Sequence, residues 1–220
     1  MNRELTLLSL VAFMAPGLAA QEDVSARLQG RVSPAVATAV SALVDSARAR
    51  GLPATPLVDK ALEGAVKGVP AERIVPAVRT VLSQLDASAG ALRAAGVAAP
   101  GEQSIEAGAF AIAAGLAVSD VSAIAGAADR EHPTAVALEV AGALAALGVP
   151  RPEAVSLVRA EIQSGRPLGE LVSLPAQVQA AMAGGATPAA AAQGLERAAA
   201  THQAPRPRGQ GKGPGNPHKP

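Results

Sequence analysis

The sequence predicts an all-α protein made of helical-hairpin repeats, with about 17 residues per helix-turn unit and about 34 per pair. Three observations lead to this fold class: a repeated segment, apolar residues at helical spacing, and a body rich in alanine. Residues 51–84 contain one helix-turn unit written twice, and each half opens with Gly, an aliphatic residue and Pro. Glycine commonly ends a helix, and proline suits the first turn of the next. We expect a solenoid-like or irregular bundle, followed by a disordered C-terminal tail.

Each half of this doubled segment carries an apolar stripe that a helix can bury on one face. The stripes consist of Leu57, Val58, Ala61, Leu62, Ala65 and Val66 in the first half, and of Ile74, Val75, Val78, Val81, Leu82 and Leu85 in the second. The second helix is predicted to continue to about Ala95. Pro76 should either kink this helix or mark its true start, because proline removes an internal hydrogen bond.

The first 20 residues have the pattern of a secretory signal peptide. Arg3 gives a short basic start, residues 5–15 are apolar, and Pro16-Gly17 interrupts this run before small residues. We expect cleavage near Ala19 or Ala20 and export to the periplasm or the medium, with no transmembrane span in the mature chain. The alternative is an uncleaved helix or anchor, although the run is shorter than the ~20 residues that span a bilayer.

The helical domain is expected over residues 21–202, with a possible internal boundary near 89–103, where Ala, Gly and Ser accumulate. Its first helix is predicted over residues 32–50. Ser33 is the expected N-cap, and Pro34 the first helical residue. The buried stripe of this helix would be Val36, Val40, Leu43, Val44 and Ala47.

The repeat continues beyond that boundary. The helix-turn units are predicted to start at Gly51, Gly68, Ala98, Gly115, Glu131, Gly148, Gly165 and Gly185. Their third positions hold Pro53, Pro70, Pro100, Ala117, Pro133, Pro150, Pro167 and Thr187. The pairs Thr55-Pro56, Ser119-Asp120 and Thr187-Pro188 are predicted to cap helices. Pro175 is predicted to split its helix, with Ser173 capping the second piece.

Two resemblances to known families are local or general. The predicted length of a helical pair is similar to that of tetratricopeptide repeats, which carry a Trp and a Tyr that this chain lacks. Residues 143–159 resemble the helix-turn-helix hairpin of ubiquitin-associated-type three-helix domains, and the turn they share is generic. Neither resemblance implies a function.

Residues 107–118 are wholly apolar and predict a buried helix. Gly108, Ala111 and Gly115 would let a neighbouring helix approach closely. The alternative is a lipid-facing or oligomerising helix that uses the same small residues.

Chemical motifs are scarce. The chain has no Cys, which excludes disulfides, thiolate metal sites and cysteine nucleophiles. It also lacks the common hydrolase, zinc-protease and phosphate-loop motifs. The one short group of metal-ligating residue types is Asp129-Arg130-Glu131-His132, which we interpret as a structural turn before Pro133. The alternative is an exported enzyme or metal-dependent binder that uses His132 and nearby carboxylates.

The densest charged group lies in the doubled segment and offers a possible interaction surface. It contains Lys60, Glu63, Lys67, Arg73 and Arg79. Glu63 and Lys67 are spaced for a helical ion pair, while Asp59 and Glu63 share a face and would suit paired carboxylates. A solvated helix face explains the same pattern. The alternative is a surface that binds an acidic partner.

Residues 203–220 form the predicted disordered tail, rich in Pro and Gly. Arg206, Arg208, Lys212 and Lys219 give it a charge of +4, while residues 21–203 hold 14 Lys and Arg against 17 Asp and Glu, a net −3. The tail would serve solubility or contact a polyanion through its charge. We do not expect nucleic acid to be the target of an exported chain.

The function that follows is that of a non-catalytic, exported helical-repeat protein. It would present a surface to another envelope protein or to itself. No catalytic residue, cofactor or metal is assigned.

Overall fold

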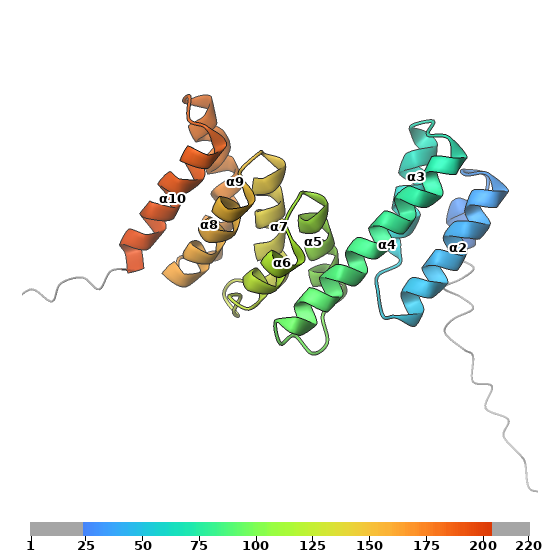
Figure 1. The fold of residues 1–220 in the computed structure, drawn as a ribbon, viewed down its shortest axis with the longest axis horizontal. Helices are drawn as coiled ribbons and strands as arrows, with labels where there is room; N and C mark the ends of the chain where they lie inside the picture. The colour runs from blue at the N-terminus through green and yellow to red at the C-terminus, as the bar shows by residue number, and fades with distance from the viewer. Residues whose placement is uncertain (1–23, 204–220) are drawn as a thin grey trace, which may run out of the picture. The chain divides into compact units, whose positions relative to one another are not determined.

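The computed structural model describes residues 24–203, and these residues are helical with no strand among them (Figure 1). The all-α prediction is therefore confirmed for this part of the chain. The chain divides into two compact units between Leu82 and Ser83, inside α4 (Ala71–Ala94). We describe each unit by itself. None of the helices between residues 24 and 203 has the length and hydrophobicity that a bilayer-spanning segment needs.

The N-terminal compact unit contains a short helical segment at residues 24–28, α2 (Pro34–Ala49), α3 (Thr55–Val66) and the first part of α4. The start of α2 is as predicted. Ser33 Oγ accepts a hydrogen bond from the Val36 N–H at 3.4 Å, and Pro34 is the first helical residue. The core of the unit is aliphatic and is formed by Leu28, Val36, Val40, Val44, Leu57, Val58, Ala61, Ile74 and Val78.

Two predictions for α3 are wrong. Val66 belongs to the predicted buried stripe but is 89% exposed, because at 100° per residue it lies on the opposite side of the helix from Leu57. Thr55 does not cap the helix, because it is the first helical residue. The preceding Ala54 has no side chain that can accept a hydrogen bond.

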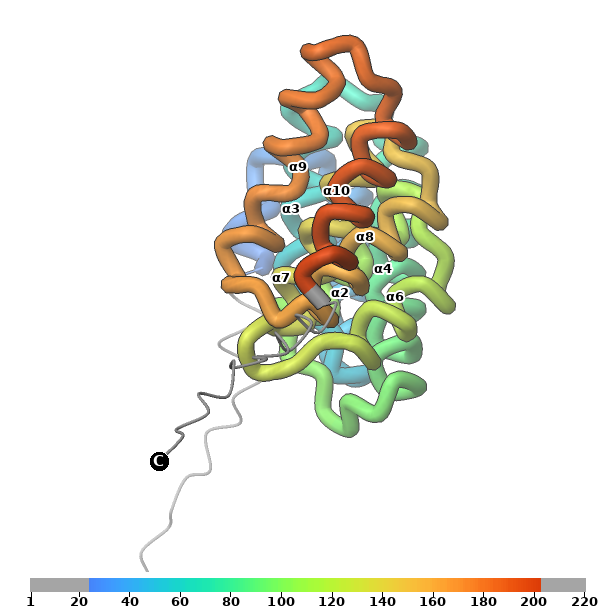
Figure 2. Tube along the Cα trace, turned by 90° about the vertical axis from the view of Figure 1, so that its left-hand side faces the viewer, coloured from blue at the N-terminus to red at the C-terminus, as the bar shows by residue number. Residues whose placement is uncertain are grey.

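The C-terminal compact unit contains the rest of α4 and six further helices. These are α5 (Glu102–Ala113), α6 (Val118–Ala125), α7 (Thr134–Ala146), α8 (Arg151–Ser164), α9 (Leu168–Ala183) and α10 (Pro188–Gln203). Helices two apart in the chain pack on one another: α5 on α7, α7 on α9, and α8 on α10. Figure 2 shows α10 beside α8. Strands in residues 115–128 or 134–147 would contradict the predicted fold. These two ranges contain α6 and α7 instead.

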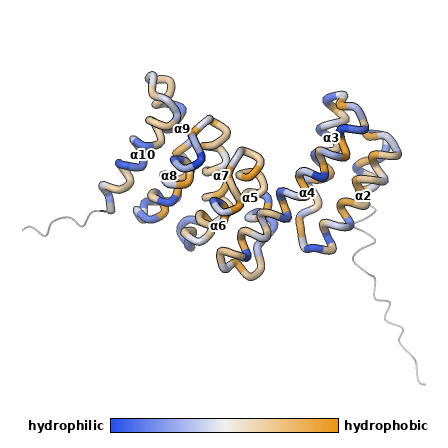
Figure 3. The backbone as a smooth tube through the Cα atoms, viewed as in Figure 1, coloured by the Kyte–Doolittle hydropathy of each residue, from blue (hydrophilic) through white to orange (hydrophobic). Residues whose placement is uncertain are grey.

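Helix α7 is central in this unit because it contacts α5, α6, α8 and α9. Its buried residues cover a little more than half of the helix circumference, and Figure 3 shows it as largely hydrophobic. Close packing depends on small residues. A Cβ at Gly142 of α7 would lie 2.6 Å from Phe110 Cε1 of α5, and a Cβ at Gly108 would lie 2.2 Å from Ser88 Oγ. The predicted role of Gly108 in close approach is confirmed, whereas Gly115 lies in the turn after α5.

Several predictions for proline and serine positions are also wrong. α4 continues from Ala71 through Pro76, which excludes Pro76 as its start, while the alternative of a kink stays a prediction. α9 continues through Pro175 instead of splitting. Ser173 consequently caps no second piece, and its Oγ donates to the Glu170 carbonyl at 2.8 Å. Ser119 is not a cap either, because α6 begins at Val118. The carboxylate of Asp120 accepts the Ala117 N–H at 2.8 Å instead.

Six helices end in the same way, with a glycine at positive φ followed by an aliphatic residue. The glycine N–H bonds to the carbonyl three residues back, and the next N–H to the carbonyl five residues back, at 2.9–3.1 Å. This is the Schellman motif, which satisfies carbonyls that a helix end leaves free. The six pairs are Gly51-Leu52, Gly68-Val69, Gly96-Val97, Gly115-Leu116, Gly148-Val149 and Gly185-Ala186.

The glycine prediction is confirmed at five of these six ends. The remaining end differs: the predicted helix-turn unit starts at Ala98, whereas Gly96 is the residue at positive φ. The prolines at the third positions of three predicted helix-turn units also lie one residue earlier, relative to the start of the helix, than expected. Pro133, Pro150 and Pro167 are N-caps with extended ψ rather than residues of the first turn.

Replacing Gly148, which has φ +84°, by Ala should lower the free energy of unfolding by about 1–2 kcal/mol, because Cβ crowds the left-handed conformation. Gly90→Ala is the matched control. Gly90 lies inside α4, and a Cβ there would meet no atom within 4 Å, so Ala should stabilise the helix by roughly 0.5–1 kcal/mol. Urea denaturation measures both changes. Equal effects of the two substitutions would contradict the assigned role of Gly148.

Candidate functional site

The hairpin of α3 and α4 carries a candidate site in which a cluster of charged side chains borders a cavity. Its turn is fixed by the Schellman motif at the end of α3, in which Val69 donates to the Gly64 carbonyl at 2.9 Å and Gly68 to the Ala65 carbonyl at 3.0 Å. This closure places Val69 beside the last turn of α3. α4 then begins at Ala71, immediately after Pro70.

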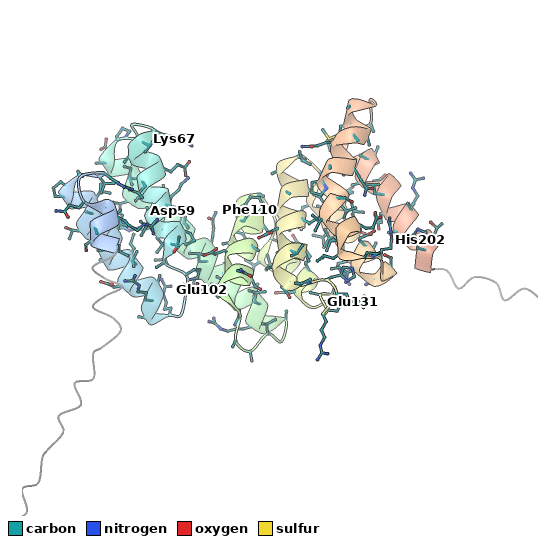
Figure 4. The ribbon with its side chains drawn as sticks, turned by 180° about the vertical axis from the view of Figure 1, so that it is seen from behind. Asp59, Lys67, Glu102, Phe110, Glu131 and His202 are labelled. Carbon is teal, nitrogen blue, oxygen red and sulfur yellow. The ribbon has the colours of Figure 1, made fainter. Side chains whose placement is uncertain are left out.

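Three charged side chains of α3 and its C-cap are joined in one cluster. The Glu63 carboxylate accepts from Lys60 Nζ at 2.9 Å through Oε2 and from Lys67 Nζ at 2.5 Å through Oε1. The hydrogen bonds from Lys67 and Lys60 and their positive charges lower the pKa of Glu63 to about 2. Glu63 is therefore ionised at any physiological pH and pairs with both ammonium groups at the surface. Figure 4 labels Lys67 at the end of α3.

A cavity of about 270 Å³ lies next to this cluster. We call it the lysine-rimmed pocket, and its lining residues are Lys60, Glu63, Gly64, Lys67, Val69, Ile74 and Ala77. Lysine and glutamate side chains form its polar part, and the two helices supply an apolar base. Gly64 keeps the helices close, since a Cβ there would lie 3.0 Å from Ile74 Cγ1.

The structure brings together only part of the predicted interaction surface. Lys60, Glu63 and Lys67 line the pocket, whereas Arg73 and Arg79 are exposed on α4 and do not. The suggested carboxylate pair is also not formed, because Asp59 pairs with Arg27 at 2.6 Å while Glu63 pairs with the lysines. Sequence reasoning missed the apolar lining. Gly64, an unexplained glycine inside a predicted helix, was the one available signal.

His132, the focus of the alternative hypothesis, is fully buried in the C-terminal compact unit. Its Nε2 donates to the Arg166 carbonyl at 2.8 Å, and its Nδ1 lies 3.1 Å from Asp129 Oδ1. The same carboxylate oxygen accepts the N–H groups of His132 and Glu131 at 2.7 and 2.9 Å. The His132 N–H is the main cause of the lowered pKa of Asp129. Glu131 is labelled in Figure 4, in the loop before α7.

This arrangement leaves neither ring nitrogen of His132 free to act as a ligand or base. Among residues 24–203 no three His, Asp or Glu side chains lie close enough to hold a metal ion. The geometry therefore gives the hypothesis of a His132-centred metal site no support. It agrees with the interpretation of residues 129–132 as a turn fixed by its own side chains.

Arg166 joins this turn to a buried acid, Glu161. Its guanidinium contacts Glu161 Oε2 at 3.3 Å and Glu170 Oε2 at 2.7 Å. The Glu161 side chain is only 1% exposed, and its Oε1 has no hydrogen-bond partner in the described part of the chain. Burial raises the pKa of Glu161, while the positive charge of Arg166 opposes this rise. Sequence reasoning did not single out Glu161 or Arg166.

The predicted polyanion contacts Arg206, Arg208, Lys212 and Lys219 lie outside the described residues, as does the predicted signal peptide. Their roles stay predictions. The one histidine near the tail that the structure describes is His202 on α10, which is exposed and adds a favourable charge interaction to ionised Glu161.

The raised pKa of Glu161 predicts a pH dependence of stability. Because the folded state favours the protonated acid, the contribution of Glu161 to the free energy of unfolding should be greatest below the ordinary pKa and should be lost as pH rises through the raised value. Glu161→Gln should remove this contribution, so its slope should differ from that of the unaltered chain in denaturation curves measured from acid to neutral pH. Glu139→Gln, which removes an exposed carboxylate on α7, should keep it. Identical slopes in all three proteins would contradict the prediction.

Comparisons with known proteins add no assignment to these geometric observations. No family model matches the chain, and neither a curated protein nor a solved structure is similar to it at a significant level. The case for a function therefore depends on the residues described above.

Proposed function

We propose that this chain is a non-catalytic, exported helical-repeat module that binds another envelope protein or a second copy of itself. The observation that carries the proposal is a hydrogen bond between equivalent positions of two successive helical pairs. His132 and Arg166 are each the second residue of a helix-turn unit. They are 34 residues apart, and His132 Nε2 bonds to the Arg166 carbonyl at 2.8 Å.

Other long-range contacts join residues at similar separations. Ser122 Oγ donates to the Ala91 carbonyl 31 residues away, and Arg27 pairs with Asp59 32 residues away in the N-terminal compact unit. Stacked hairpins produce contacts of this kind because each pair packs against the next. The packing of α5 on α7, α7 on α9 and α8 on α10 favours the same arrangement.

A repeat of stacked hairpins suits binding rather than chemistry. Such arrays expose extended surfaces on which partners dock. Single large apolar residues are exposed on the described helices, among them Val66 at the end of α3 and Val172 on α9, which are 89% and 54% exposed. A partner that covers them would gain roughly 25 cal/mol per Å² of apolar surface removed from water.

Site-specific photo-crosslinking in the native host tests the binding role. A photoreactive residue at Val66 or Val172 of the full chain should give a discrete product with one envelope protein or with a second copy. The same residue at exposed Arg130 serves as the control position. If no position gives a discrete product and the purified chain turns over a substrate, the proposed function is wrong.

Export is tested separately by N-terminal sequencing of the protein isolated from its host. Cleavage should leave a chain that begins at Ala20 or Gln21. The matched variant Leu8→Arg should block export, because a charge disrupts the apolar run. Recovery of the intact chain from the cytoplasm of the unaltered strain would contradict export without affecting the binding proposal.

A further inference from the structure

We propose that the lysine-rimmed pocket binds an acidic segment of a partner protein and takes up one aliphatic side chain of that segment. The inference deepens the proposed function, on which it rests, because it names the site and the chemistry of the partner. All lining residues belong to the N-terminal compact unit.

The size and lining of the pocket fit one side chain. Its volume of about 270 Å³ lies below the roughly 300–1,000 Å³ typical of small-molecule and cofactor sites. Val69, Ile74 and Ala77 give it an apolar base, and Gly64 contributes no side chain. An aliphatic group that enters it leaves water for hydrocarbon contacts, which favours binding. A phosphate or a sugar would gain no binding free energy from burial against these three apolar side chains.

The rim provides hydrogen-bond donors for carboxylates. An ammonium group has three N–H donors, and Lys60 and Lys67 each direct one to Glu63. The others remain for a ligand. A partner carboxylate at this rim would therefore meet two charged donor groups, while Glu63 offsets part of their positive charge.

The charge of the N-terminal compact unit points to the same partner. Residues 24–82 hold eight Lys and Arg against four Asp and Glu, a net +4, and Glu22 and Asp23 reduce this to +2 over residues 21–82, whereas residues 83–203 hold six against eleven, a net −5. The excess includes Arg73, which is exposed next to the pocket residue Ile74. The electrostatic field of this excess positive charge speeds the encounter with an acidic segment. Residues 24–82 contain no aromatic side chain on which nucleic-acid bases could stack.

The test measures binding of labelled peptides to the full chain by fluorescence anisotropy. The probe is an acidic peptide with one leucine between Asp and Glu residues, and two control peptides replace either the leucine by Asn or the acids by Gln. Ala77→Leu fills the pocket, and Lys60→Glu with Lys67→Glu reverses its rim. Arg31→Glu is the matched control, because Arg31 is exposed in the same unit but does not line the pocket.

The acidic leucine peptide should bind the unaltered chain. Either pocket variant, and either control peptide, should weaken this binding by about tenfold or more. Arg31→Glu should change it less than about twofold, and binding should weaken as salt rises from about 50 to about 300 mM. Circular dichroism checks that each variant is folded. Should Ala77→Leu unfold, Lys67→Glu alone decides the matter, since that side chain is exposed.

Three results would overturn the inference. The first is equal binding of the acidic peptide to the unaltered chain and to the pocket variants. The second is binding of heparin that is as tight as binding of the peptide and that Ala77→Leu does not change. The third is concentration-dependent dimerisation in light scattering that Ala77→Leu abolishes, which would make a second copy the occupant. A crosslinked companion at Val172 would persist in each case, so failure of the pocket is distinguishable from failure of the proposed function.

Discussion

The closure of helix ends by a glycine and an aliphatic residue is the constraint on which this structure depends. Each such end satisfies two carbonyl groups and turns the chain back within a few residues. The aliphatic residue also joins the core, as Leu52, Leu116 and Val149 do. Fourteen of the buried apolar residues in the described chain are alanines, which contribute less on burial than the Leu, Val and Ile residues that make up the rest and which touch a neighbouring helix only where the backbones lie close. Accurate turns are therefore needed to keep the helices close enough to pack.

Two of the turns that depart from this pattern explain the main polar cluster. Where other helix-turn units place a leucine, valine or alanine after the turn glycine, these two carry His132 and Arg166. At the first, the Asp129 carboxylate binds the N–H groups that a glycine turn would direct to a helix end. At the second, Ser164 Oγ donates to the Glu161 carbonyl at 2.6 Å. This bond replaces the one that the Arg166 N–H would make to the same carbonyl in a Schellman motif. The His132–Arg166 bond then connects the two turns.

This cluster contains hydrogen bonds and ion pairs that favour the folded state and one buried group that disfavours it. Arg166 is satisfied by two carboxylates, and the imidazole by two oxygen atoms. Glu161 is buried with one oxygen that has no partner among the described residues, and a buried acid of this kind resists ionisation. A buried polar network is weak evidence for stability. It does favour a single register of neighbouring helices, because any other register would leave these groups unpaired.

Local sequence determined the helix ends at glycine most reliably, whereas the predicted caps Thr55, Ser119 and Ser173 do not cap a helix. Ser33, Thr187 and the turn glycines act within a few residues, so their effects follow from backbone geometry alone. The continuity of α9 through Pro175 depends on how the completed helices pack, which the sequence pattern does not specify. The exposure of Val66 follows from helical spacing, because this residue lies opposite Leu57 on α3. The charged cluster of Lys60, Glu63 and Lys67 could be predicted from helical spacing. The pocket beside it could not, because it exists only where Gly64 faces Ile74 across two helices. Tertiary structure likewise decided the pairing of His132 with Arg166, since only the packed chain brings residues 34 positions apart into contact.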